Sequence, residues 1–223
     1  MYISEIFESI QGEGKFTGRP TTFIRLFGCN YANKEYSKDR RCHPCKYCDE
    51  RESFEGKRTK MHLGLIIYKV NALNNKYVCV TGGEPLIQEE TMPLVYELLY
   101  NDYIVTIETN GSIPIEQCAY KRSYSYCMDI KLSNSRGVLH PDINCYENLG
   151  VLKSQDEVKF VISSRSDYEE AKTILNNYPT KAEIIFSPVN GDIVLAKDIG
   201  DWLIEEKYPA RIGLQLHRLM KIK

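Results

Sequence analysis

The sequence has no apolar run that approaches the ~20 residues of a membrane-spanning helix. It has no secretory signal either, because Glu5 and Glu8 interrupt the N-terminus and no hydrophobic stretch with a small-residue cleavage site follows. An excess of one charge is also missing, since 29 Lys and Arg residues face 30 Asp and Glu residues and the net charge is -1. Binding to nucleic acid or to a membrane surface needs a basic excess. We therefore expect a cytoplasmic protein that binds neither.

The chain contains no internal repeat, no low-complexity segment and no long Pro/Gly/Ser linker, so we predict a single domain over residues 1–223. Hydrophobic residues make up 43% and charged residues 26%, as in a folded globular domain. Helical periods predict helices over about 61–75 and 90–100, one that begins with the capping pair Ser166 and Glu169, and one around Leu195 and Trp202. Strands are expected at about 21–28, 77–81, 103–108, 125–131, 157–162 and 182–187, with a closing segment at 211–217.

Strands that alternate with helices predict an α/β fold with a parallel sheet or barrel and right-handed crossovers. Polar and glycine-rich residues gather directly after the predicted strands. In barrel-like α/β folds the loops after the strand ends build the active site. We therefore expect one enzyme site at that edge. The segments concerned are 28–29, 81–85, 108–110, Lys131, 187–188 and 215–217.

Eight cysteines need an explanation in a chain for which disulfides are not expected. Cys79 and Cys127 lie in strand-like runs, where cysteine acts as a small buried hydrophobe. Thiolates two residues apart in a tight turn point to one metal centre. Zinc would take four thiolates, whereas an iron–sulfur cluster could take three and leave one iron open. The spacing leaves both possible for the four clustered cysteines, Cys29, Cys42, Cys45 and Cys48.

Six motifs follow one another along the chain. They are Gln11-Gly12-Glu13-Gly14, Arg25 with Gly28-Cys29-Asn30, Cys45-Lys46-Tyr47-Cys48-Asp49, Thr81-Gly82-Gly83-Glu84-Pro85, Glu108-Thr109-Asn110-Gly111 and Gln215-Leu216-His217-Arg218. Together they resemble the radical S-adenosylmethionine (SAM) superfamily and, almost end to end, its 7-carboxy-7-deazaguanine synthases of the queuosine-precursor pathway. The resemblance implies an incomplete parallel β/α barrel of the radical SAM type, with an enlarged cluster-binding loop at about 29–58.

Two motifs depart from the family pattern. Fifteen residues separate Cys29 from Cys45, where the superfamily usually has C-x₃-C-x₂-C. The insertion is similar to the enlarged first loop of some of these synthases. Arg218 also replaces the lysine of the family's Q-x-H-K ending.

The resemblance implies that Cys29, Cys45 and Cys48 hold a [4Fe-4S] cluster and that Cys42 is a spare thiol. SAM would chelate the open iron, and its reductive cleavage would release a 5′-deoxyadenosyl radical. Tyr47 would sit near the adenine. The other residues expected on the SAM side are Asp49, Gly82 and Gly83, which permit close backbone approach, Glu84, which would accept from the SAM ammonium, and Asp129, Ile130 and Lys131, of which only Lys131 matches the family's S-P-K segment.

The implied reaction converts 6-carboxy-5,6,7,8-tetrahydropterin to 7-carboxy-7-deazaguanine with loss of ammonia. Hydrogen would be abstracted from C6 and returned, so that SAM acts catalytically. Arg25 suits the substrate carboxylate, because a guanidinium donates two parallel hydrogen bonds. The other residues expected beside the pterin are Ile10, Gln11, Gly12, Glu13, Thr81, Gln215 and His217.

The family also implies Mg²⁺ beside the substrate, an external one-electron reductant of the flavodoxin or ferredoxin type, and a homodimer. Its metal ligand is a hydroxyl residue directly after the cysteine-aspartate pair, and Glu50 stands at that position here. Mg²⁺ prefers oxygen ligands, so we expect Glu50 as a candidate ligand.

Two other functions share part of the pattern. A radical SAM activase of a glycyl-radical enzyme has the cluster and the GGEP motif, but it does not predict the QGEG segment or the Q-x-H ending. A zinc-stabilised binding module would use the four clustered cysteines, but it does not predict GGEP.

Overall fold

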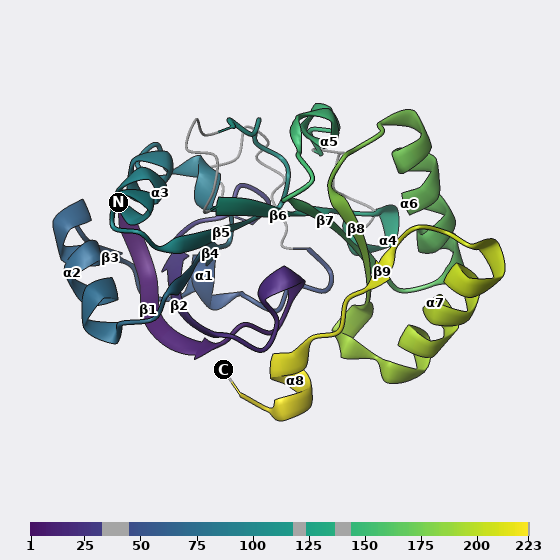
Figure 1. The fold of residues 1–223 in the computed structure, drawn as a ribbon, viewed down its shortest axis with the longest axis horizontal. Coiled ribbons are helices and arrows are strands. Elements are labelled where there is room, and N and C mark those ends of the chain that lie inside the picture. Colours follow the sequence, from purple (N-terminus) through teal and green to yellow (C-terminus); the bar gives the residue numbers. More distant parts are fainter. Residues whose placement is uncertain (33–44, 118–123, 137–143, 223) are drawn as a thin grey trace.

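One open sheet of nine strands organises the computed structural model, which describes residues 1–32, 45–117, 124–136 and 144–222 (Figure 1). The strand order is β3-β1-β2-β4-β5-β6-β7-β8-β9, with β1 antiparallel to β2 and β3 and every later pair parallel. The sheet does not close, which confirms the expected incomplete barrel. The strands are β1 (Tyr2–Ile10), β2 (Pro20–Leu26), β3 (Thr59–Lys60), β4 (Tyr77–Gly82), β5 (Ile104–Thr109), β6 (Tyr124–Ile130), β7 (Glu157–Ile162), β8 (Glu183–Pro188) and β9 (Arg211–Ile212).

Four longer helices, α2 (Leu63–Leu73), α3 (Thr91–Tyr100), α6 (Arg165–Asn177) and α7 (Ile193–Glu206), cover the outer face of the curved sheet (Figure 1). They pack against β1, β5, β7 and β8 respectively. No helix in the described ranges is long and apolar enough to cross a bilayer. The remaining helices are short: α1 (Glu52–Glu55), α4 (Ser133–Arg136), α5 (Glu147–Val151), α8 (Leu216–Met220) and the 3-10 turns η1 (Gly14–Phe16), η2 (Pro85–Ile87) and η3 (Val189–Gly191).

The strands divide their side chains between a core and a cavity, because successive residues of a strand face opposite sides of the sheet. In β7, Val158, Phe160 and Ile162 are fully buried in the core under the helices. Lys159 and Val161, the residues between them, line a cavity on the other side. This alternation lets a buried parallel sheet carry charged residues on one face.

The structure corrects three sequence-based expectations. The N-terminal strand β1 was not predicted, because apolar and polar residues do not alternate regularly along it and it includes Glu5 and Glu8. Helix α6 begins earlier than Ser166, because Ser164 is its N-cap and its side chain accepts from the Asp167 N–H. The closing segment 211–217 is only partly extended, and it passes from the short β9 into α8.

Candidate active site

A cavity lies where the parallel strands end, and the loops that follow them form its wall. Two of the predicted site residues, Glu84 and Ile130, lie outside this wall. Ile130 is 1% exposed within the core, because it follows Asp129 in β6 and faces the helices. Every other predicted site residue lines the cavity, which brings together Ile10, Gln11, Gly12, Glu13, Arg25, Cys29, Cys45, Tyr47, Cys48, Asp49, Glu50, Thr81, Gly82, Gly83, Asp129, Lys131, Gln215 and His217.

Cys29, Cys45 and Cys48 form what we call the thiol wall. Cys29 lies in a small hydrophobic cluster with Tyr31 and Phe54, and Cys45 and Cys48 pack against that cluster. Burial raises the pKa of Cys29 to about 12 and also raises the pKa values of the other two thiols. Cys42 lies outside the described residues.

The thiol wall fits an iron–sulfur cluster. Within the described ranges, no three His, Cys, Asp or Glu side chains converge as one metal ion would require. The three cysteines nevertheless line one cavity. In a cluster each thiolate binds a different iron atom, so the sulfurs need not meet at one point.

Gly82 and Gly83 hold the turn after β4 against the loop that carries Cys29. A Cβ on Gly83 would lie 2.5 Å from Cys29 Cβ, and a Cβ on Gly82 would lie 2.2 Å from the carbonyl oxygen of Leu26. The Glu84 N–H also donates to Gly28 O at 2.9 Å. The two glycines are therefore required for close packing of protein on protein, in addition to any approach by a ligand.

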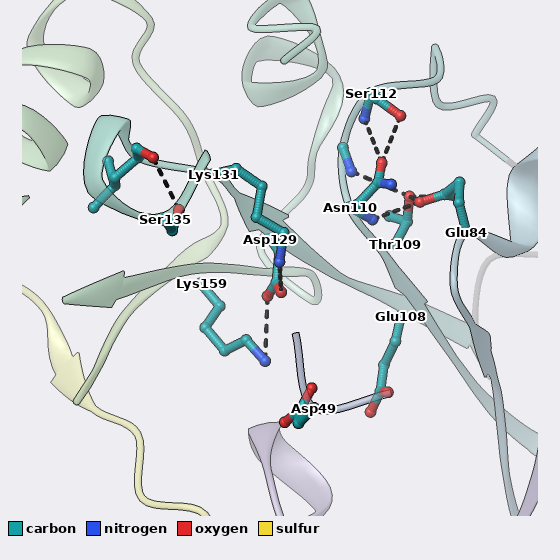
Figure 2. A network of polar contacts seen from close by, with 12 residues as sticks. Asp49, Glu84, Glu108, Thr109, Asn110, Ser112, Asp129, Lys131, Ser135 and Lys159 are labelled. Carbon is teal, nitrogen blue, oxygen red and sulfur yellow. Dashed lines mark hydrogen bonds and ion pairs between the residues drawn. The ribbon is translucent and has the colours of Figure 1, made fainter. Parts of the chain in front are cut away.

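Glu84 turns inward and stabilises the end of β5 (Figure 2). Its carboxylate accepts from the Leu86 N–H, the Thr109 hydroxyl and the Asn110 N–H at 2.6–2.9 Å. Burial raises the pKa of Glu84 to about 7, although the backbone donors of Asn110 and Leu86 lower it. The carboxylate is fully buried and accepts from protein donors on both oxygens, and its contact with a SAM ammonium stays a prediction.

Charged residues from three parts of the chain form a second part of the cavity lining, which we call the charged wall. Lys159 pairs with Glu13 and, at 3.2 Å, with Asp129, and Asp129 pairs with Lys131 at 2.8 Å. Figure 2 shows both lysines directed at the Asp129 carboxylate. Burial alone would raise the pKa of Asp129, but the two lysines hold it below its usual value.

The C-terminal segment completes the charged wall. Gln215 Nε2 donates to Glu13 at 2.5 Å, and the Leu216 N–H donates to Gly12 O at 2.9 Å. A Cβ on Gly12 would lie 2.0 Å from His217 Nδ1, so only glycine allows the imidazole this position. The N-terminal QGEG segment and the C-terminal Q-x-H segment are therefore in direct contact.

Sequence reasoning did not select Lys159 or Glu108 as site residues. Glu108 accepts from the Thr81 hydroxyl at 2.8 Å and from Gln11 Nε2 at 3.2 Å. Glu108 stands at a predicted strand end, which was the available signal. Lys159 lies inside a strand, and only the alternation of buried and polar residues in 157–162 could have indicated it.

Arg25 enters the cavity from β2 and is held by two carboxylates. Its Nε pairs with Glu5 at 3.0 Å and its Nη1 with Glu50 at 2.7 Å. Burial raises the pKa of Glu50 to about 7, and Arg25 acts in the opposite direction. Nearby, Asp49 pairs with Arg218 at 3.3 Å, which links the cysteine loop to the C-terminal segment.

Comparisons with known proteins identify the family of the chain. The sequence profile of the radical SAM superfamily matches residues 36–125. A 7-carboxy-7-deazaguanine synthase of Methanospirillum hungatei is 37% identical over 99% of this chain and 85% of that protein. One from Chlorobaculum tepidum is 34% identical over 97% of this chain and 92% of that protein.

A solved structure supports the fold. The crystal structure of QueE from Escherichia coli matches 97% of this chain and 94% of that chain with a TM-score of 0.75, at 23% sequence identity. The curated relatives are similar over nearly the full length of this chain, and the activase and zinc-module alternatives are not favoured. The chain belongs to the 7-carboxy-7-deazaguanine synthase family of radical SAM enzymes.

Proposed function

We propose that this chain is a radical SAM carbon–nitrogen lyase that converts 6-carboxy-5,6,7,8-tetrahydropterin to 7-carboxy-7-deazaguanine with loss of ammonia, within 7-deazapurine biosynthesis. One observation carries the proposal: the thiol wall, Arg25 and the charged wall line a single cavity. An activase acts on a segment of a partner protein, whereas Arg25 and the charged wall suit a small anionic substrate. Nearly full-length relatives named as this synthase support the same reading.

The thiol wall would hold the [4Fe-4S] cluster through Cys29, Cys45 and Cys48. When bound, the cluster and SAM supply a reductive cleavage of a carbon–sulfur bond that yields a 5′-deoxyadenosyl radical. Tyr31 and Phe54 shield the thiols from solvent, and Tyr47 stands between the last two cysteines on the cavity wall. Lys131 offers a buried cation beside this wall that suits the SAM carboxylate.

The charged wall suits a pterin ring. The aminopyrimidinone edge of a pterin presents adjacent N–H donors, and a carboxylate such as Glu13 accepts two of them. Lys159 and Gln215 fix Glu13 from two directions, so its oxygens are oriented before substrate arrives. Arg25 would pair with the pterin carboxylate through a two-pronged contact.

The family resemblance also implies an electron donor of the flavodoxin or ferredoxin type, a homodimer and a cytoplasmic location, and we expect all three for this chain. Mg²⁺ would have Glu50 as its candidate ligand. The described residues provide no converging set of three metal-binding side chains, so such an ion would take its other ligands from substrate and water.

Anaerobic reconstitution with iron and sulfide tests the function. The holoprotein is incubated with SAM, a reductant and 6-carboxy-5,6,7,8-tetrahydropterin, and 7-carboxy-7-deazaguanine and ammonia are measured. We expect product in excess of SAM consumed. Reductive SAM cleavage without product, together with formation of a glycyl radical on an added partner enzyme, would favour the activase instead.

A further inference from the structure

Two carboxylates share the guanidinium of Arg25, and they differ in how firmly they are held. Glu5 lies on β1 directly opposite Arg25 in the antiparallel register, so the sheet fixes it there. Glu50 lies in the loop after Cys48, lines the cavity and has a side chain that is 43% exposed. Arg25 itself is buried, with a side chain that is 9% exposed. A buried cation of this kind needs a charge partner at all times.

The geometry of the guanidinium leaves one edge for a ligand. A guanidinium offers two edges that can grip a carboxylate with parallel hydrogen bonds, one that includes Nε and one formed by the two terminal nitrogens. Glu5 occupies Nε of Arg25, so the edge of terminal nitrogens remains. Glu50 Oε2 pairs with Nη1, one of those two terminal nitrogens, at 2.7 Å. A second carboxylate can pair there in two-pronged fashion only if Glu50 leaves.

We propose that Glu50 is an internal stand-in for the carboxylate of the substrate, and that 6-carboxypterins bind by exchanging their carboxylate for that of Glu50 on Arg25. This inference rests on the proposed function, since it assigns Arg25 to the substrate carboxylate. In the free protein Glu50 occupies a terminal nitrogen of the guanidinium, while Glu5 remains the fixed charge partner of Arg25. A pterin without a carboxylate cannot replace it, so the exchange makes the carboxylate a condition for tight binding.

The exchange predicts that weakening the stand-in strengthens the ligand. Glu50→Gln keeps the shape of the side chain but removes its charge, so an incoming carboxylate has less to displace. A half-exposed ion pair contributes about 1 kcal/mol, which corresponds to about fivefold in affinity. We therefore expect Glu50→Gln to bind 6-carboxypterin about fivefold more tightly than the parent protein, with the affinity for unsubstituted pterin unchanged.

Equilibrium dialysis of the anaerobically reconstituted holoprotein tests this in the absence of added Mg²⁺, because Glu50 is also the candidate ligand of that ion. Each pterin is quantified by its fluorescence. Asp49→Asn is the matched control, because Asp49 lines the same cavity but pairs with Arg218. It removes the same charge without freeing Arg25 and should tighten 6-carboxypterin much less. Glu50→Thr provides a second variant without the carboxylate, should Glu50→Gln load its cluster poorly.

Unchanged or weaker binding of 6-carboxypterin by both Glu50 variants would overturn the exchange, as would an equal gain from Asp49→Asn. Product formation by the parent protein is measured in parallel and separates the two proposals. Product with no gain in affinity in the Glu50 variants removes the exchange alone. A gain in affinity without product retains the exchange and removes the proposed reaction.

Discussion

The two walls of the cavity solve different chemical problems. The thiol wall consists of soft donors that pack against hydrophobic side chains, where burial raises the pKa of each thiol. The charged wall consists of acids and bases that neutralise one another before any ligand arrives. One wall is therefore incomplete without its inorganic group, and the other is preorganised by the protein alone. The thiol wall would hold the cluster, and the charged wall would hold the organic ligands. Substitutions in one wall should therefore leave the function of the other intact.

Loss of a thiol should have the largest effect. Cys29→Ala, Cys45→Ala and Cys48→Ala should each abolish the brown chromophore and SAM cleavage, because each removes an iron ligand. Absorbance after anaerobic reconstitution and 5′-deoxyadenosine formation provide the measurement. Cys145→Ala is the control, because Cys145 is a free cysteine that does not line the cavity. Cys42→Ala should also leave both signals largely intact. Loss of the cluster in Cys42→Ala but not in Cys29→Ala would contradict the ligand assignment.

Arg25→Ala should affect the organic ligand and leave the cluster intact. Removing one partner of a buried ion pair costs about 3–5 kcal/mol, so kcat/KM for product should fall by roughly two to four orders of magnitude. Arg25→Lys should recover little, because an ammonium lacks the two-pronged geometry. Product and uncoupled 5′-deoxyadenosine are measured side by side. Arg19→Ala is the control, since Arg19 lies over the Tyr77 ring and not in the cavity. Near-parental product from Arg25→Ala would remove Arg25 from the substrate site.

Lys159→Met should show that the charged wall is part of the fold. It leaves Glu13 and Asp129 facing each other without the shared cation, a loss of about 3 kcal/mol in the free energy of unfolding. The thermal midpoint of the holoprotein should fall by roughly 6–12 °C, while iron content stays near parental. Lys197→Met is a surface control, because Lys197 pairs with Asp201 and its side chain is 74% exposed. Equal shifts in the two variants would show that burial of the charged wall adds nothing.

Gly12→Ala should produce the smallest effect, at the junction of the N- and C-terminal segments. The added methyl group would displace His217, and overpacking of this kind costs about 1–3 kcal/mol. We expect roughly a tenfold loss of kcat/KM and faster hydrogen exchange in residues 214–222. A Cβ on Gly150 meets nothing within 4 Å, so Gly150→Ala should leave both measurements unchanged. Unaltered exchange in Gly12→Ala would show that the C-terminal segment does not depend on this contact.

Local patterns in the sequence were sufficient for most of the fold. Apolar runs predicted β7 at its observed bounds and the other parallel strands within a few residues, because strand period and turn residues are local properties. Strand β1 escaped this reasoning because it has no clean alternation, and its pairing with β2 decides its conformation.

The sequence by itself determined which residues end the strands, and parallel topology then placed those residues at one edge. Only the tertiary structure decided how they pair. Gln215 meets Glu13 across 202 positions of chain, and Lys159 meets Glu13 across 146. Glu84 turns away from the cavity, and Glu50 turns toward Arg25. Such contacts depend on strand order, on register and on which partner best neutralises a buried charge, and none of these is a property of a short stretch of sequence.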